Sequence, residues 1–192
     1  MRLVFTYDYS SPYAYLAATQ VDALAARTGV DLVWRPILLG GLFRDLGGAD
    51  VPLFTMPPAK RRMIEADLDR WAAWWGVPLR WPTPFPTRSL LALRCTLAHP
   101  EPRGFAKRVF HAAWGEGRDI ADPAVLADCG ADADVIARAP STREALRAAT
   151  DEAKAEGVFG VPTFQIDGRW TFWGQDRLPM VESVLRGWEP PV

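Results

Sequence analysis

The short stretch Ser10-Ser11-Pro12-Tyr13 places a hydroxyl group where a helix is expected to begin. Pro12 suits the first helical position, where its missing N–H would go unused, so Ser11 is predicted to be the N-cap. A helix N-terminus carries unpaired N–H groups and a partial positive charge, which stabilise an anion placed beside it. The stretch therefore predicts either a purely structural cap or a site that holds an anion.

The other reactive residue types offer no partner for this hydroxyl in the sequence. A serine is a poor nucleophile unless a base activates it, and neither His99 nor His111 is near Ser11 in the sequence. The two cysteines, Cys95 and Cys129, are far apart and form no C-x-x-C pair. We expect both cysteines to be buried as small apolar residues, with no disulfide and no metal site.

The N-terminal elements form a predicted β-α-β unit. Residues 2–7 (RLVFTY) are expected to form a buried strand, and a helix is expected from Pro12 to about Thr28, ended by Gly29. Residues 31–37 (DLVWRPI) predict a second strand, which ends at Pro36 or lies at a sheet edge because proline cannot donate to a neighbouring strand. Such a unit favours two parallel strands with a right-handed crossover.

A long helical block is expected to follow. Residues 40–58 are rich in glycine and proline, which predicts a structured loop. The next helix is indicated by apolar residues at helical spacing, namely Ile64, Leu68, Trp71 and Trp75. Further helices are predicted at about residues 87–98, at 103–114, from Asp122-Pro123 onward, and at 142–156, the last with a capping box in Ser141 and Glu144.

The C-terminal segment changes to a β-β-α pattern. VPTFQI (161–166) and RWTFW (169–173) predict two short strands joined by Asp167-Gly168, a hairpin turn, and a final amphipathic helix follows. The order of elements indicates an α/β fold with a thioredoxin-like core and a large all-helical insertion. The expected boundaries are 1–39 and 157–192 for the core and 40–156 for the insertion domain.

In thioredoxin-like cores a redox cysteine lies at the N-terminus of the first helix, and a cis-proline loop faces it. Val161-Pro162-Thr163 fits that loop, so we expect a cis Pro162, although only about 5–6% of X-Pro bonds are cis. Ser11-Pro12-Tyr13-Ala14 then occupies the C-x-x-C position without either sulfur, which excludes dithiol exchange by the chain itself. The use that remains is to hold an external thiolate, for which glutathione is the expected source.

Four segments carry a resemblance to a known family: DYSSPYAYL (8–16), DLDRWAAWWGVPL (67–79), VFGVPTF (158–164) and FWGQDRL (172–178). Over nearly its whole length the chain resembles the 2-hydroxychromene-2-carboxylate isomerases and the related kappa-class glutathione transferases, in the DsbA-like branch of thioredoxin folds. The second and fourth segments are not general thioredoxin features, so the set is specific. The resemblance implies an enzyme that uses glutathione.

The resemblance also implies which residues hold the cofactor. Ser11 matches the catalytic serine that contacts the glutathione sulfur, and Val161, before Pro162, matches the residue whose backbone pairs with the cysteinyl part. The segment that matches the holder of the γ-glutamyl end consists of Trp173, Gly174, Gln175 (where relatives often have asparagine) and Asp176. Apart from the family, Asp176 also fits the N-cap of the final helix, and the two roles are compatible.

The substrate side departs from the family. Family members place a lysine near Arg44, an asparagine-arginine pair near Phe54 and Thr55, and a tyrosine near Phe85; this chain lacks that pair and that tyrosine. The cations in the first turn of the helix from Pro58 form either a solvated face or a patch that attracts a carboxylate, and they are Lys60, Arg61 and Arg62. The substrate residues expected are Arg44, Phe54, Thr55, Lys60 and Phe85, although the aromatic ones also suit a core.

Composition limits the remaining function classes. A formal net charge of -1 gives no argument for nucleic acid, and no apolar run approaches the roughly 20 residues that span a bilayer. The N-terminal sequence MRLVFTYDYS becomes polar too early for a signal peptide, so a cytoplasmic location is expected.

These observations favour a glutathione-dependent cis-trans isomerase. Its substrate would be a small aromatic carboxylate from catabolism, of the 2-hydroxychromene-2-carboxylate type, isomerised by reversible thiolate addition. The alternative is a kappa-like glutathione transferase. A DsbA-type oxidoreductase and a non-catalytic thioredoxin-like binding module share the fold and are less favoured. The resemblance further implies a homodimer.

Overall fold

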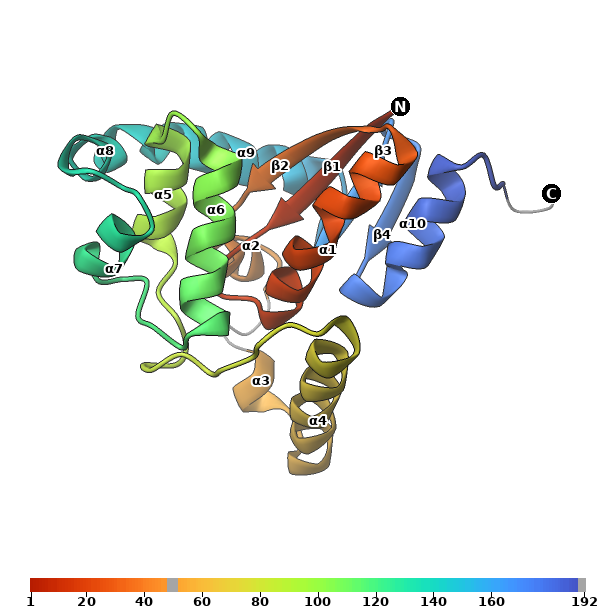
Figure 1. Ribbon diagram of the computed structural model, residues 1–192, viewed down its shortest axis with the longest axis horizontal. Helices are drawn as coiled ribbons and strands as arrows, with labels where there is room; N and C mark the ends of the chain where they lie inside the picture. Colours follow the sequence, from red (N-terminus) through yellow and green to blue (C-terminus); the bar gives the residue numbers. More distant parts are fainter. Residues whose placement is uncertain (48–51, 190–192) are drawn as a thin grey trace.

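The computed structural model describes residues 1–47 and 52–189, and its centre is a mixed sheet (Figure 1). The strands are β1 (Arg2–Tyr7), β2 (Asp31–Pro36), β3 (Thr163–Ile166) and β4 (Trp170–Trp173), in the order β2-β1-β3-β4. β1 pairs in parallel with β2, with Leu3 opposite Leu32, and antiparallel with β3, with Phe5 opposite Phe164. The predicted parallel pair and the edge position of β2 are therefore confirmed.

Two turns form as their residue types predict. Helix α1 (Pro12–Thr28) begins after the N-cap Ser11 and ends at Gly29, whose φ of 67° is in the left-handed region that favours glycine. The β3–β4 hairpin turns at Asp167 and Gly168, with φ values of 49° and 67°, and Arg169 N donates to Ile166 O at 3.0 Å. Positive φ at both central residues is typical of the type I′ turn that suits twisted strands.

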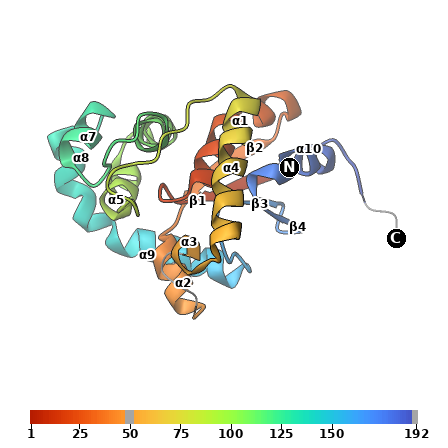
Figure 2. The ribbon, with the colours of Figure 1, turned by 90° about the horizontal axis from the view of Figure 1, so that it is seen from below.

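Helices fill the chain between β2 and β3. They are α2 (Leu39–Asp45), α3 (Pro52–Thr55), α4 (Pro58–Trp75), α5 (Leu90–Ala98), α6 (Pro102–Phe110), the π-helical turn η1 (His111–Gly115), α7 (Pro123–Asp128), α8 (Ala133–Arg138), the 3₁₀ turn η2 (Ala139–Thr142) and α9 (Arg143–Ala155). After β4 come the 3₁₀ turn η3 (Gln175–Arg177) and α10 (Leu178–Leu185). Figures 1 and 2 show α5 to α8 gathered at one end of the sheet, with α10 beside α1.

The prediction of a loop over residues 40–58 was wrong for most of this segment. Helix α2 forms although it contains Gly40 and Gly41, each of which costs about 1 kcal/mol in a helix relative to alanine. Burial of the Leu42 side chain in the core offsets that cost. Helix α3 forms as a single short turn, and residues 48–51 lie outside the described part of the chain.

The capping box predicted for α9 was also wrong. Ser141 lies in η2, where its Oγ donates to Arg138 O at 2.7 Å, and α9 begins only at Arg143. The N-cap, Thr142, makes no capping hydrogen bond with its side chain. A capping box needs the serine at the N-cap itself, and the preceding 3₁₀ turn shifts the start of the helix by one residue.

One hydrophobic core joins the sheet to the helical block. Residues of β1, α1 and β3 belong to the same buried cluster as residues of α5, α6 and η1, including the fully buried Trp114. Cys95 and Cys129 are free and buried, as predicted. No helix within residues 1–47 and 52–189 is both long and apolar enough to cross a membrane.

Candidate functional site

The first turn of α1 lies against the loop before β3. Ser11 is buried, and its Oγ accepts from Ala14 N at 3.2 Å, as an N-cap does. The same Oγ donates to Val161 O at 3.3 Å, across 150 residues of sequence. The peptide bond between Val161 and Pro162 is cis, as predicted. The structure therefore brings Ser11 and the cis-proline loop together.

A buried carboxylate fixes the turn that carries Ser11. Asp8 Oδ1 accepts from Ser10 N at 2.9 Å, and its Oδ2 accepts from Leu39 N at 2.8 Å at the start of α2. Its carboxyl also accepts from the Ser89 side chain, and burial raises the pKa of Asp8 above its ordinary value. Asp8 is not among the residues predicted from the sequence, where its signal is an acidic residue directly after a buried strand.

The segment after β4 reaches the same loop. Gly174 N donates to Pro162 O at 3.0 Å, and Gly174 has a φ of 107°, which side-chain-bearing residues rarely adopt. A Cβ at this position would come within 2.5 Å of Asp176 Oδ1. The ring of Trp173 is half exposed and packs against Phe159, with the centroids 5.1 Å apart.

Gln175 and Asp176 differ in their surroundings. Gln175 is 1% exposed, and its Oε1 is a buried acceptor without a hydrogen-bond partner within residues 1–47 and 52–189. Such an atom usually finds a partner, which makes Gln175 Oε1 a candidate acceptor for a ligand. Asp176 is exposed and does not cap the final helix, because the N-cap of α10 is Arg177, without a capping side-chain bond. The capping role predicted for Asp176 was therefore wrong.

Tyr13, two residues after Ser11, connects α1 to α4. Its hydroxyl donates to Asp67 Oδ2 at 3.4 Å. Burial, the negative charge of Asp67 and that of Asp176 raise the pKa of Tyr13 to about 12, so its hydroxyl keeps its proton at neutral pH. Asp176 therefore lies close enough to this end of α1 to act on it electrostatically.

The residues predicted for the substrate side are only partly brought together. Phe54 on α3 packs edge-to-face on Phe85, with ring centroids 5.9 Å apart, and Thr55 follows Phe54 on the same turn. Lys60 is exposed in the first turn of α4. Arg44 lies on α2, where its Nε donates to Gly40 O at 3.2 Å.

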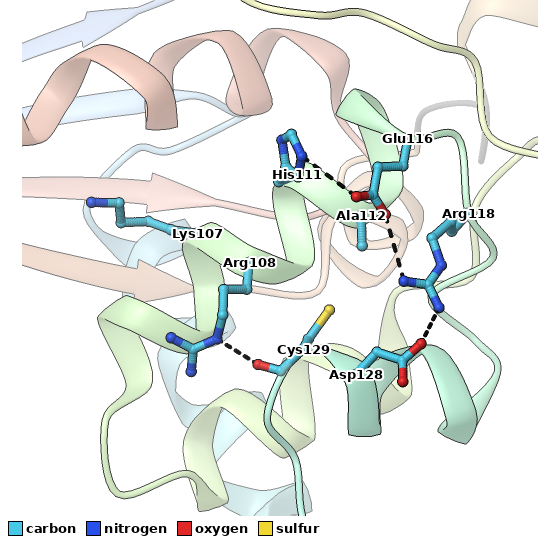
Figure 3. Close-up of a pocket in the computed structure, with 8 residues that line it drawn as sticks. All are labelled: Lys107, Arg108, His111, Ala112, Glu116, Arg118, Asp128 and Cys129. Atoms are coloured by element: carbon cyan, nitrogen blue, oxygen red, sulfur yellow. Dashed lines mark hydrogen bonds and ion pairs between the residues drawn. The ribbon is translucent and has the colours of Figure 1, made fainter.

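A cavity of about 350 Å³ lies elsewhere, on the helical block (Figure 3). Arg118 pairs there with Asp128 and Glu116, and His111 Nε2 lies 3.6 Å from Glu116 Oε1. The thiol of Cys129 points into it, and burial raises the pKa of this thiol, which disfavours the reactive thiolate. None of the residues predicted for the site lines this cavity, and it offers no reaction centre.

The strands and helices follow the order β-α-β and then β-β-α, and the first helix begins opposite a cis-proline loop; this arrangement defines the class as thioredoxin-fold proteins. The family model of the DSBA-like thioredoxin domain matches residues 2–186 of the chain. A protein of Sphingobium xenophagum named 2-hydroxychromene-2-carboxylate isomerase is 33% identical over 195 residues, covering 94% of this chain and 96% of that protein.

Two further relatives, one by sequence and one by structure, match nearly the whole chain as well. A Caenorhabditis elegans protein named glutathione S-transferase kappa 2 is 26% identical, covering 94% of this chain and 90% of its own. A solved structure of a 2-hydroxychromene-2-carboxylate isomerase superposes with a TM-score of 0.83 at 27% identity, covering 97% of this chain and 95% of that one. The chain belongs to the DsbA-like thioredoxin family and, within it, to the family of 2-hydroxychromene-2-carboxylate isomerases.

Proposed function

We propose that the protein is a glutathione-dependent cis-trans isomerase of an aromatic carboxylate of the 2-hydroxychromene-2-carboxylate type. The observation that carries the proposal is the position of the Ser11 hydroxyl, at the N-terminus of α1 and 3.3 Å from Val161 O on the cis-proline loop. A hydroxyl there can donate to a thiolate but cannot form a disulfide with it. The names of the isomerase relatives support the reaction type.

Bound glutathione would supply a thiolate that adds to a conjugated carbon, turns a double bond into a rotatable single bond, and is then eliminated. The protein would lower the pKa of that thiol and hold the tripeptide. The Ser11 hydroxyl would donate to the sulfur, and the partial positive charge of the first turn of α1 favours the negative charge. We assign Ser11 as the catalytic residue on this basis.

The residues around the cis-proline loop fit the rest of the tripeptide. The backbone of Val161, before Pro162, would pair with the cysteinyl part. At the γ-glutamyl end, Gln175 Oε1 is a buried acceptor without a partner in the described residues, and an ammonium group would supply the missing donor. The exposed carboxylate of Asp176 would accept from the same ammonium, and Trp173 and Gly174 shape this side of the site.

On the substrate side we propose a position between α2, α3 and the start of α4. The rings of Phe54 and Phe85 would contact the aromatic part of the substrate, since they already pack edge-to-face. Thr55 lies beside them, and Arg44 and Lys60 are the cations proposed to attract its carboxylate.

We further propose a cytoplasmic location and a homodimer. Two buried, unpaired thiols, Cys95 and Cys129, suit a reducing compartment, where glutathione is also available in its thiol form.

The homodimer is proposed from the family resemblance, and light scattering on the eluted peak of a sizing column would measure the mass. A monomer mass would contradict it.

The function is tested by following 2-hydroxychromene-2-carboxylate spectroscopically with and without glutathione. We expect conversion only when glutathione is present, and a fall in kcat/KM of about 10- to 100-fold in Ser11→Ala, which removes a hydrogen bond to a charged sulfur. Ser141→Ala is the matched control, because this exposed hydroxyl donates to a backbone carbonyl at the end of α8, that of Arg138. Conversion without glutathione, or unchanged turnover in Ser11→Ala, would contradict the proposal.

A kappa-like glutathione transferase is the second candidate, favoured by the kappa-class relatives. A transferase would use the same thiolate but would retain the sulfur in its product. Mass analysis of the product separates the two, because an isomer keeps the substrate mass and a conjugate gains that of glutathione. Turnover in an insulin-reduction assay would instead indicate a DsbA-type oxidoreductase.

A further inference from the structure

Four aromatic rings form a continuous row from the turn that carries Ser11 to the surface of the helical block. Trp114 is fully buried, and its Nε1 donates at 2.7 Å to the carbonyl oxygen of Tyr9, two residues before Ser11. The row continues edge-to-face with centroid distances of 5.6 Å, 5.1 Å and 5.9 Å. In order from the core outward, the aromatic row consists of Trp114, Trp81, Phe85 and Phe54.

The outer end of the aromatic row is open to solvent. Phe54 is 52% exposed, although burial of its ring would be favourable. Edge-to-face packing leaves the faces and edges of the outer rings available for one more flat group. An aromatic substrate that continues the row would be at the end of a chain of contacts that starts beside Ser11.

A single guanidinium group lies over this open end. Arg61 Cζ is 5.9 Å from the centroid of the Phe54 ring, and within residues 1–47 and 52–189 no other arginine or lysine stacks on a ring of the row. Arg61 forms an ion pair with Glu65 one turn further on, through Nε at 3.1 Å. A planar guanidinium beside an aromatic ring suits a ligand that carries both a ring and a carboxylate.

The start of α4 lacks the negative charge that a helix N-terminus favours. The helix has 18 residues, its first turn contains no acidic residue, and Lys60 and Arg61 lie there instead. Cations at a helix N-terminus oppose the helix dipole, and the carboxylate that pairs with Arg61, Glu65, lies one turn further along the helix. A carboxylate on the Nη atoms of Arg61 would interact favourably with both cations and with the helix dipole.

We propose that Arg61 is the specificity-determining residue that binds the carboxylate of an aromatic substrate whose ring continues the aromatic row at Phe54. The proposal rests on the proposed function and deepens it, because it names one cation among the several near the substrate side.

The probe for this site is trans-cinnamate, a conjugated aromatic carboxylate, titrated calorimetrically into the protein in the presence of glutathione. Wild-type protein is expected to bind it, and Arg61→Gln to weaken binding about tenfold, since a charged hydrogen-bonded pair is lost. Arg62→Gln is the matched control, with the same change of net charge one residue away. Uncharged cinnamamide is expected to bind wild type and Arg61→Gln equally.

Absence of cinnamate binding to the wild type, unchanged affinity in Arg61→Gln, or an equal loss in Arg62→Gln would each overturn the assignment of Arg61. Thermal unfolding of each variant verifies that the fold is intact. Failure of the proposed function has a different signature: no glutathione-dependent isomerisation by the wild type, with the cinnamate results as expected. With an active enzyme, Arg61→Gln should raise KM about tenfold and leave kcat nearly unchanged.

Discussion

At the scale of single residues, the geometry of Ser11 suits a group that stabilises a thiolate without reacting with it. Its hydrogen bond to Val161 O is 3.3 Å long, which is longer than the usual range for a hydroxyl donor, so the bond is weak. Redirecting that hydrogen to a sulfur would therefore cost little. A cysteine in the same place could attack oxidised glutathione, forming a mixed disulfide and releasing one glutathione thiolate. A hydroxyl cannot enter this exchange, so the sulfur of bound glutathione stays free to add to a carbon and leave.

Replacement of Gln175 should affect stability and glutathione affinity in opposite directions. Replacement by leucine keeps most of the volume and removes a buried acceptor that has no partner in the described residues, so the ligand-free protein should be at least as stable as the wild type. Glutathione affinity should fall about tenfold, because the ligand loses that acceptor. Thermal unfolding and calorimetric titration measure the two quantities. Unchanged affinity would show that Gln175 does not face the ligand.

The residues predicted from sequence were those with a local signal. Ser11 and Pro162 could be predicted because a serine-proline pair marks a helix start and a valine-proline pair precedes a hairpin. For Asp8 the sequence shows only its position directly after a buried strand, since its partners Leu39 and Ser89 become neighbours only when three separate segments fold together. The roles in glutathione binding remain predictions that the variants above test.

At the scale of elements, an ion-pair cluster joins the first and last helices. Glu182 on α10 accepts from Arg27 at the end of α1, at 2.6 Å, and from Arg186 at 2.9 Å. Hydrogen bonds from Arg27, followed by those from Arg186, lower the pKa of Glu182 from 4.5 to about 2. This contact holds α10 beside α1, and α10 follows directly on the segment proposed to bind the γ-glutamyl end.

Glu182→Gln should lower the free energy of unfolding at neutral pH by about 1 kcal/mol, the upper range for an exposed pair. A carboxylate with a lowered pKa in the folded state stabilises fully above its unfolded pKa and loses this contribution as the pH falls through the folded pKa. The difference between variant and wild type should therefore shrink between pH 4.5 and about 2. Asp134→Asn, which breaks an exposed pair within α8, is the control. A difference that does not depend on pH would contradict the assignment.

Helices and strands whose sequence features all favour the same structure were predicted correctly. Those whose sequence features conflict were not. Helix α1 has a cap, an apolar face and a terminal glycine, all of which agree. Helix α2 contains two glycines, which disfavour a helix, and one leucine whose burial favours it. Only the tertiary structure shows that the burial of this leucine outweighs the cost of the glycines. The start of α9 depends on a 3₁₀ turn whose hydrogen bonds have no sequence signature.

At the scale of the whole molecule, we propose the division into a core of residues 1–39 and 157–192 and an insertion of residues 40–156. The fold class was predictable because the order of strands and helices on either side of the long insertion, β-α-β before it and β-β-α after it, is that of a thioredoxin-like core. The packing between the two parts was not, because one buried cluster includes residues of both. The insertion therefore completes the core, and in the proposed function it would also supply the aromatic side of the site.

This shared core predicts a single cooperative unfolding transition. Near-ultraviolet circular dichroism reports the packing of aromatic residues in both parts, Trp34 and Trp114 among them, and far-ultraviolet circular dichroism reports the helices and strands. The two unfolding curves should therefore coincide. Glutathione should raise the midpoint by linkage, as does any ligand that binds only the folded state. Two separated transitions would contradict one shared core.

The pKa of the glutathione thiol in the complex tests the central claim most directly. Thiolate absorbance in the ultraviolet, followed against pH with the tripeptide bound, gives that pKa. The account predicts a value below that of an ordinary cysteine thiol, about 8.5, and a return toward the ordinary value in Ser11→Ala. A bound thiol with the ordinary pKa, or one that Ser11→Ala leaves unchanged, would contradict the claim that Ser11 and the N-terminus of α1 stabilise a borrowed thiolate.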